Sequence, residues 1–302
     1  CRFHGFHGFH GFHGFHGGAP VSGVALVAHH ERSTARAHAI FAAAWCSERG
    51  YDFWMPAPDA DALGLGEHRS DRPVAEADVV LSLGGDGTML RSVGLLDGAV
   101  TPLLGVNLGS LGYLTEVEPD DLGDALVKFF AGPQTGEWSI DDRMMLDVSV
   151  NGVRAGRALN EAVVEKSESG HTVRLLARID GEPFTHYAAD GLIVATPTGS
   201  TAYSLSARGP IVSPRHRAVL LTPVSPHMLF DRSLVLDPSE IVEIEVSGHR
   251  RAALAIDGQP IARLNEGDIV TCIPSDVNAN FVRFGAYRYH QILKAKFGLA
   301  DR

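Results

Sequence analysis

The chain has 302 residues, which is long enough for two domains, or for one large domain, with an ample core. Hydrophobic residues make up 45% and charged residues 21%, as in ordinary globular proteins, and the formal net charge of −10 argues against a general nucleic-acid or anionic-membrane binder. Three cysteines (Cys1, Cys46 and Cys272) without Cys-x-x-Cys spacing, and the lack of a membrane-length apolar run or a signal peptide, indicate a reduced cytoplasmic chain with no zinc site and no membrane segment.

The first 18 residues differ from the rest of the chain. Phe-His-Gly occurs five times in succession between Phe3 and Gly17. A tract of this composition buries no core, so we predict that residues 1–18 are disordered and lie outside the fold. Their histidines could bind Ni²⁺ or Zn²⁺, but such repeats are more often compositional accidents or added sequence, and we assign no metal site to them.

Strands and helices are predicted to alternate in the first half of the chain. The expected strands are 21–28, 51–55, 79–83 and 102–106, and the expected helices are 33–49, a helix from Thr88 onward, and 119–131. The segment 56–73 is rich in Pro, Gly and Asp, so we expect a loop with one helical turn. A second glycine-rich loop follows at 107–113. The alternation predicts a doubly wound parallel sheet.

The pattern changes after Gly132-Pro133, where short alternating segments replace helices. The clearest expected strands are 146–150, 172–179, 192–195, 241–246 and 252–256. The pairs Asn151-Gly152, Asp180-Gly181 and Asp257-Gly258 are typical of tight hairpin turns. We therefore predict an α/β domain over 19–135 and a β-sandwich-like domain over 136–276. Residues 287–297 look helical again, and we expect 277–302 to return to the first domain.

A glycine-rich turn between a buried strand and a helix lies within Asp78–Arg91. Glycines let the backbone approach an anion, and the N–H groups at a helix start favour negative charge, which predicts a phosphate site. The expected contacts are Gly84, Gly85, Gly87 and Thr88. An ordinary strand–helix turn is the alternative, but Asp86 among such amides is electrostatically costly unless it binds a metal or accepts a proton. No P-loop and no Gly-x-Gly-x-x-Gly motif is present.

Two polar stretches interrupt apolar strands in the β region. Asn160-Glu161 lies in a strand-like segment, where a surface pair on an edge strand is an equally good interpretation. The run Thr196–Ser206 offers hydroxyls and free amides at a possible helix start, which suits the ribose or pyrophosphate of a nucleotide. Tyr203 adds a flat face for a base. A turn capped by Ser and Thr would explain the hydroxyls but not the whole run.

Four motifs, in the same order, resemble those of bacterial-type NAD kinases: GGDGT at 84–88, Asn160-Glu161, DGLIVATPTGSTAYSLS at 190–206 and IDGQ at 256–259. GGDGT alone is shared with diacylglycerol and sphingosine kinases and, more loosely, with phosphofructokinases. The resemblance covers about residues 23–297 and implies two domains with the active site in the cleft between them. One departure is Arg208, where the family usually has glycine; it could crowd a turn that needs a positive φ, or face solvent.

The resemblance also implies a reaction and a set of site residues. A phosphoryl group would move from ATP or inorganic polyphosphate to the 2′-hydroxyl of the adenosine ribose of NAD, giving NADP, with Mg²⁺ or another divalent cation bridging the donor phosphates. Asp86 would be the catalytic proton acceptor, or would instead position the metal. The positions that correspond to NAD-binding residues are Asp86, Gly87, Arg91, Asn160, Glu161, His171, Asp190, Thr201, Ala202, Tyr203, Ser204, Leu205, Ser206 and Gln259.

Two other functions compete with this one. A lipid kinase would share GGDGT, but it would need an apolar acyl groove, which the polar run 198–206 disfavours. An inactive dinucleotide-binding regulator is the second alternative, and the intact Asp86 and Asn160-Glu161 argue against it. The family leads us to expect a homodimer or homotetramer, with neither nucleic acid nor membrane as a partner.

Overall fold

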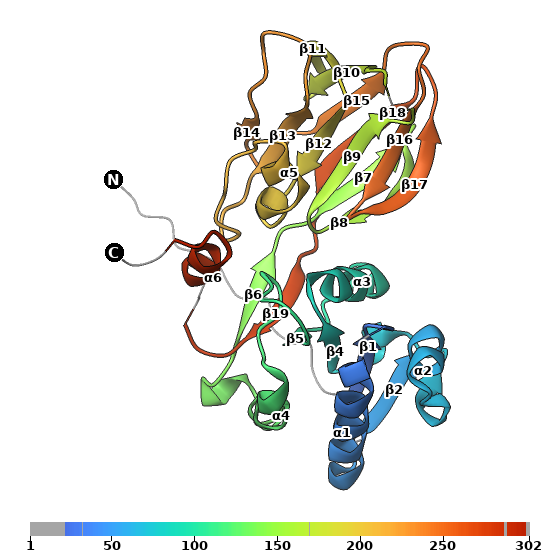
Figure 1. Ribbon diagram of the computed structural model, residues 1–302. Coiled ribbons are helices and arrows are strands. Elements are labelled where there is room, and N and C mark those ends of the chain that lie inside the picture. The colour runs from blue at the N-terminus through green and yellow to red at the C-terminus, as the bar shows by residue number, and fades with distance from the viewer. Residues whose placement is uncertain (1–21, 32, 169, 287–288, 300–302) are drawn as a thin grey trace, which may run out of the picture.

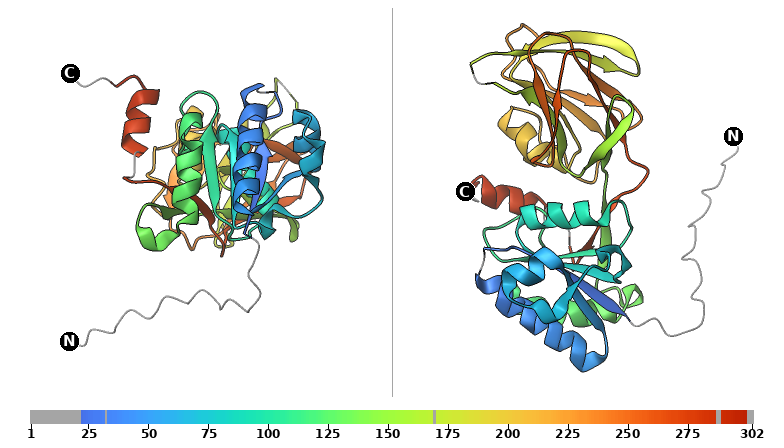
Figure 2. Two further views of the ribbon diagram at one scale, coloured as in Figure 1. Left: turned by 90° about the horizontal axis from the view of Figure 1, so that it is seen from below. Right: turned by 90° about the vertical axis from the view of Figure 1, so that its right-hand side faces the viewer.

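The computed structural model describes residues 22–31, 33–168, 170–286 and 289–299 (Figure 1). The predicted disorder of the Phe-His-Gly repeat concerns residues outside this range. The chain forms two halves that lie one above the other in Figure 1, an α/β half below and an all-β half above. A turned view shows helix α3 (Asp86–Leu96) lying between the two halves (Figure 2). The predicted fold class, α/β followed by a β sandwich, is confirmed.

The lower half is a seven-stranded sheet with helices on both faces. Its strands, in sheet order, are β3 (Arg69–Ser70), β2 (Asp52–Pro56), β1 (Gly23–Ala28), β4 (Val79–Gly84), β5 (Leu103–Asn107), β19 (Ala279–Arg283) and β6 (Ser139–Arg143). All neighbours pair in parallel except β6, which is antiparallel to β19. The other α-helices of this half are α1 (Ser33–Arg49), α2 (Ala57–Leu63), α4 (Leu122–Phe130) and α6 (Tyr289–Lys296).

The central strands are buried on both faces, as expected where helices cover a parallel sheet. Every residue of β1 and β4 is buried. Alternate side chains of β1 enter different cores: Val24 and Leu26 pack with α1 and α4, whereas Ala25 and Val27 pack with α3. This arrangement places the loops after β1 and β4 at the same edge of the sheet.

The segment 56–73 is more ordered than predicted. Helix α2 occupies seven of its residues, and a short 3₁₀ turn (Gly66–His68) and β3 follow. The prediction of a loop with one helical turn is therefore wrong in extent. Pro58 falls in the first turn of α2, where the missing N–H costs no helical hydrogen bond, and Gly64 ends the helix with a φ of 64°.

The upper half is a sandwich of two six-stranded antiparallel sheets. One sheet contains β11 (Glu182–Ala189), β10 (Val173–Ile179), β15 (Val242–Val246), β18 (Ile269–Pro274), β7 (Leu146–Val150) and β8 (Val153–Ala158). The other contains β14 (Leu234–Leu236), β13 (Val219–Val224), β12 (Gly191–Ala195), β9 (Glu161–Lys166), β16 (Ala252–Ile256) and β17 (Gln259–Leu264). Apolar side chains from both sheets form one buried core between them.

The hairpin turns were predicted correctly. Asn151-Gly152, Asp180-Gly181 and Asp257-Gly258 each have a positive φ at both residues, as a two-residue hairpin loop requires. The division of the sheets falls later than the expected boundary at 136, since β6 still pairs with β19 in the lower sheet. None of the helices in the described part of the chain is long and apolar enough to cross a membrane.

Candidate functional site

The predicted phosphate loop lies at the carboxyl end of β4. Strand β4 ends at Gly84, and α3 begins at Asp86. A Cβ at Gly84 would overlap the hydroxyl of Thr88, so the loop closes on the first turn of the helix only because glycine stands there. The predicted strand–glycine turn–helix arrangement is therefore present, and the N-terminus of an 11-residue helix opens into a pocket.

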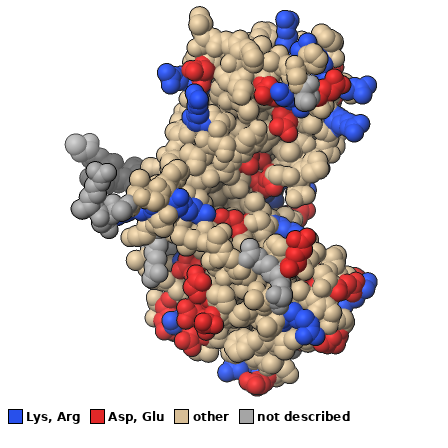
Figure 3. All heavy atoms as spheres, in the orientation of Figure 1, with Lys and Arg blue, Asp and Glu red and all other residues tan. Residues whose placement is uncertain are grey.

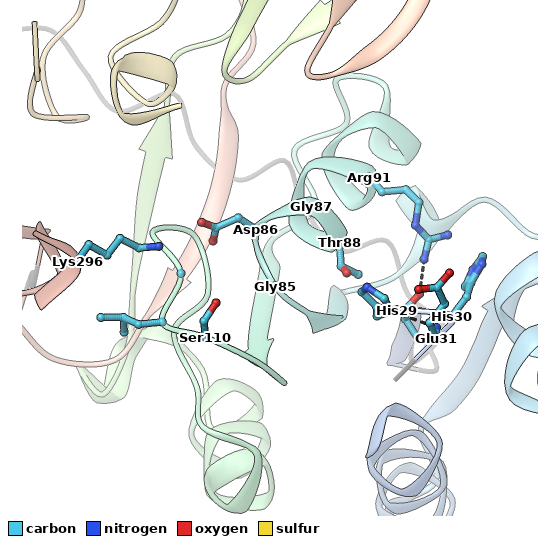
Figure 4. A pocket seen from close by; sticks show the side chains of 13 residues that line it. His29, His30, Glu31, Gly85, Asp86, Gly87, Thr88, Arg91, Ser110 and Lys296 are labelled. Atoms are coloured by element: carbon cyan, nitrogen blue, oxygen red, sulfur yellow. Dashed lines mark hydrogen bonds between the residues drawn. The ribbon is translucent and has the colours of Figure 1, made fainter. Parts of the chain in front are cut away.

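This phosphate pocket has a volume of about 590 Å³ (Figure 4). It is lined by Ala28, His29, His30, Glu31, Gly85, Asp86, Gly87, Thr88, Arg91, Ser110, Leu111, Gly112 and Lys296. Three regions far apart in sequence therefore join the glycine loop: the end of β1, the second glycine-rich loop and α6. In the space-filling view the molecule narrows between its two halves, and side chains of both charges reach this waist (Figure 3).

The carboxylate of Asp86 anchors the second glycine-rich loop. Its two oxygens accept hydrogen bonds from the backbone N–H groups of Tyr113 and Leu114, each at 2.9 Å. A carboxylate offers about four lone-pair positions, so one position on each oxygen stays available to a substrate. Asp86 is thus held rigidly at the pocket and can still accept a proton.

Arg91 lies one helical turn beyond Asp86, as predicted, but its guanidinium is bound within the protein. It forms a bidentate pair with the fully buried Asp59 of α2, at 2.6 and 2.9 Å, and donates to the carbonyl of Ala28. Arg91 still lines the pocket, so it can add a positive field there. Asp59 of α2 therefore fixes the orientation of the Arg91 guanidinium.

Glu161 begins β9 and Asn160 directly precedes it, and the hairpin of the fourth motif holds both residues. The carboxylate of Asp257 accepts the N–H groups of Leu159, Asn160 and Glu161 at 2.8, 2.7 and 3.0 Å. Asp257 itself adopts a φ of 46°, which Asp tolerates better than most residues. The IDGQ motif thus positions the Asn-Glu pair.

Glu161 is buried, with 6% of its surface exposed, and its Oε2 has no hydrogen-bond partner. Burial and the nearby Asp257 carboxylate raise the pKa of Glu161 to about 8, although the backbone N–H of Tyr203 acts in the opposite direction. Burial also raises the pKa of Asp257, against its three N–H donors. A buried carboxyl with one oxygen unpaired is a candidate for a ligand contact.

The TPTGSTAY run packs directly against the Asn-Glu pair. The hydroxyl of Thr196 donates to the carbonyl of Leu159, and the backbone N–H of Thr196 donates to the carbonyl of Asn160. A Cβ at Gly199 would overlap the backbone of Asn160, so this close approach requires glycine. The two motifs, 36 to 39 residues apart in the chain at these contacts, therefore pack against each other.

The remaining predicted NAD contacts differ in their placement. Tyr203 is 37% exposed, and burial followed by the charges of Glu165, Asp190 and Glu161 raises its pKa, which places it beside the predicted pair. Asp190 bonds Lys166 at 2.6 Å. Five positions (Thr201, Ala202, Tyr203, Leu205 and Ser206) are accessible to solvent. Ser204 differs from these five: it is fully buried, and its hydroxyl contacts that of Thr222.

Two further predicted residues line pockets other than the phosphate pocket. His171 lines a separate surface pocket of about 420 Å³ together with Lys166, the partner of Asp190. Gln259 lines a pocket of about 510 Å³ between α3 and the β16–β17 hairpin, which shares Gly87 and Arg91 with the phosphate pocket. Arg208 has a φ of 66°, so the turn does need a positive φ, and the residue is exposed, which agrees with the alternative that it faces solvent.

Sequence reasoning missed several residues of the phosphate pocket: His29, His30, Glu31, Ser110 and Lys296. A signal existed for the first three, because they follow β1 and ligands of doubly wound sheets bind beyond the carboxyl ends of strands. Nothing in the sequence places Lys296 there. The described residues include no group of three or more His, Cys, Asp or Glu side chains that could hold a metal ion.

Asp86 lies beside a glycine loop and a helix N-terminus, and the sandwich contributes Glu161, a buried acid with one unpaired oxygen. This arrangement is suited to phosphoryl transfer onto a polar acceptor. The fold and the site define a two-domain phosphotransferase of the GGDGT class.

Comparisons with known proteins identify the family. Residues 68–133 match the ATP-NAD kinase N-terminal domain and 159–284 the ATP-NAD kinase C-terminal domain. NAD kinase of Heliobacterium modesticaldum is 43% identical over 228 residues, covering 73% of this chain and 78% of that protein. The structure of yeast NADH kinase complexed with NADH superposes with a TM-score of 0.84 at 24% identity, over 94% of this chain and 89% of that one. An NAD kinase from Archaeoglobus fulgidus in complex with ATP gives 0.70 at 25% identity, over 92% and 100%.

The chain belongs to the NAD kinase family, and its enzyme activity is the phosphorylation of NAD to NADP. The predicted family is confirmed. The comparisons favour neither a lipid kinase nor an inactive regulator.

Proposed function

We propose that the chain transfers the γ-phosphoryl group of ATP to the 2′-hydroxyl of the adenosine ribose of NAD beside Asp86. The observation that carries this proposal is the Asp86 carboxylate, which two backbone N–H groups hold at the first residue of α3 inside the phosphate pocket. The donor phosphates would lie over the glycine loop, where the helix N-terminus favours negative charge. The related Archaeoglobus protein, whose structure contains ATP, supports ATP as the donor.

The acceptor would bind along the sandwich side of the site. Asn160 and the unpaired Oε2 of Glu161 would hydrogen-bond the adenosine part of NAD, and the exposed ring of Tyr203 would pack against a base. Asp86 would then accept the proton of the 2′-hydroxyl as the phosphoryl group arrives.

Mg²⁺ would neutralise charge on the donor phosphates and orient them. The pocket lining fits such an ion, since Mg²⁺ is usually held by substrate phosphates with one or two carboxylates, and Glu31 supplies one such carboxylate. Inorganic polyphosphate remains a second possible donor, since the pocket features named above recognise phosphate and not a base.

We further propose a cytoplasmic location and a homodimeric or homotetrameric assembly. The location is supported by Cys46 and Cys272, which are free, buried thiols, as expected in a reducing compartment. The assembly is an expectation from the family, and sedimentation of the purified enzyme would test it.

The decisive experiment compares the wild type with Asp86→Asn in an NADP-specific cycling assay. If Asp86 is the general base, kcat falls by about 100-fold or more, while NAD binds with near wild-type affinity. Asn accepts through one oxygen only, so the Tyr113–Leu114 loop could loosen; an unchanged thermal midpoint would exclude this cause. A nearly unchanged kcat with a shifted Mg²⁺ dependence would show that Asp86 positions the metal instead.

A further inference from the structure

The C-terminal helix brings a lysine into the phosphate pocket. Helix α6 lies beside the junction of the two halves (Figure 1), and Lys296, its last residue, lines the pocket with Gly85, Asp86 and Gly87. Figure 4 shows its ammonium group pointing toward Asp86. The lysine is 210 positions beyond Asp86 in the chain, so only the fold brings the two together.

The position of Lys296 is linked to that of Asp86 through a single residue. The ammonium nitrogen lies 4.7 Å from the centroid of the Tyr113 ring, in the geometry of a cation–π contact. The backbone N–H of Tyr113 donates to Asp86 at 2.9 Å. Tyr113, in the second glycine-rich loop, therefore contacts both Asp86 and Lys296 and helps to orient them.

The charge of Lys296 is uncompensated, in contrast to that of Arg91. These two are the Lys and Arg residues among those that line the pocket. Arg91 is paired with the buried Asp59, whereas Lys296 forms no ion pair with any described residue. The pocket also contains the carboxylates of Glu31 and Asp86, which would repel a polyanionic donor. Together with the Mg²⁺ that would accompany the donor, Lys296 is placed to offset this negative charge.

We propose that Lys296 contacts the donor phosphates and supplies the positive charge that a lysine within the loop supplies in P-loop enzymes. This inference rests on the proposed function, because it takes the phosphate pocket as the donor site. A lysine acts here as a mobile point charge with three donors, which suits phosphates that change geometry during transfer. The cation–π contact with Tyr113 holds it near the loop when the donor is absent.

The test compares Lys296→Gln with Lys296→Arg and with Lys294→Gln, a matched control that removes the same charge from the same helix outside the pocket. Loss of a charge-assisted hydrogen bond predicts that Lys296→Gln lowers kcat/KM for ATP by about 10- to 100-fold while the KM for NAD changes by less than about threefold. Lys296→Arg should retain most activity, and Lys294→Gln should resemble the wild type. Thermal midpoints should agree among all four proteins.

Tripolyphosphate binding, measured by titration calorimetry, provides a readout that does not depend on turnover. Its Kd should rise in Lys296→Gln by the factor seen for ATP. Unchanged ATP kinetics and unchanged tripolyphosphate binding, or a larger effect on the KM for NAD, would overturn the proposal. If the wild type made no NADP from NAD and ATP, the proposed function would fail, and tripolyphosphate binding would still decide whether Lys296 binds phosphate.

Discussion

Among single residues, the carboxyl pair Glu161–Asp257 gives the site its most unusual chemistry. The carboxylate of Asp257 accepts hydrogen bonds from three backbone N–H groups, whereas Oε2 of Glu161 has no hydrogen-bond partner. Two acids in one buried place cannot both be charged cheaply, so one of them holds its proton to a higher pH. The structure assigns that behaviour to Glu161, with a pKa of about 8.

This shift predicts how stability depends on pH. A carboxyl whose pKa rises from 4.5 in the unfolded chain to about 8 in the folded one binds its proton more tightly when folded. Its contribution to stability is complete below the lower value and is lost as the pH rises toward the upper one. Glu161→Gln has no titratable group at this position. The thermal midpoint of the variant minus that of the wild type should therefore increase from pH 5 to pH 8.

Thermal melts of the two proteins in parallel buffers check this expectation. Both proteins keep Asp257. A pH-independent effect of the substitution shifts the difference in midpoint by the same amount at every pH, so only the titration of Glu161 makes this difference vary with pH. A difference in midpoint that does not vary with pH would show that Glu161 titrates normally.

Among the elements, α2 is the one whose role was least expected. Its Asp59 is fully buried and accepts hydrogen bonds from the backbone N–H of Ala28 and from Arg91 of α3. The helix therefore ties the end of β1 to the helix that begins at the phosphate loop. The segment 56–73, which has the composition of a loop, therefore contains a helix that fixes the positions of Ala28 and Arg91 at the phosphate pocket.

Asp59→Ala should accordingly destabilise the protein by about 1–3 kcal/mol, because it leaves the buried N–H of Ala28 without an acceptor. Asp61→Ala, on the same helix, removes an exposed pair with Arg69 and should cost at most about 1 kcal/mol. Urea unfolding followed by circular dichroism measures both. Equal losses in the two variants would mean that the buried bonds of Asp59 contribute nothing beyond a surface pair.

In the whole molecule, the two halves are joined by packing as well as by the chain. Met145 and Leu159, which border the sandwich strands, belong to the core cluster that α3 forms with the lower sheet. The phosphate pocket is lined by residues of the lower half, whereas Glu161 begins β9 of the upper half, so the two proposed parts of the site come from different halves. Substrates that bridge them should bind where the two halves meet.

We expect the divalent cation to enter this junction with the donor. Mg²⁺ gives up its water reluctantly and is usually held by substrate phosphates together with one or two carboxylates. EDTA should therefore abolish NADP formation, and excess Mg²⁺ should restore it, while the thermal midpoint of the ligand-free enzyme stays unchanged. A midpoint that falls on chelation would instead reveal a resident structural metal.

Much of the fold and of the site followed from local patterns. The Asp-Gly and Asn-Gly turns were readable because a positive φ at two adjacent residues restricts the residue types at those positions alone. The glycine loop with Asp86 was readable for the same reason, since the strand, the turn and the helix start adjoin in the chain.

Contacts between distant segments could not be read in this way. How the helices and sheets pack decides these contacts: the Asp59–Arg91 pair, the burial of Ser204 and the position of Lys296 in the pocket of Asp86. Composition even argued against α2, because proline and glycine mark loops except where they fall at the two ends of a helix. Periodicity and motifs describe neighbours along the chain, whereas a phosphate pocket is built from the ends of several elements that only the packed core brings together.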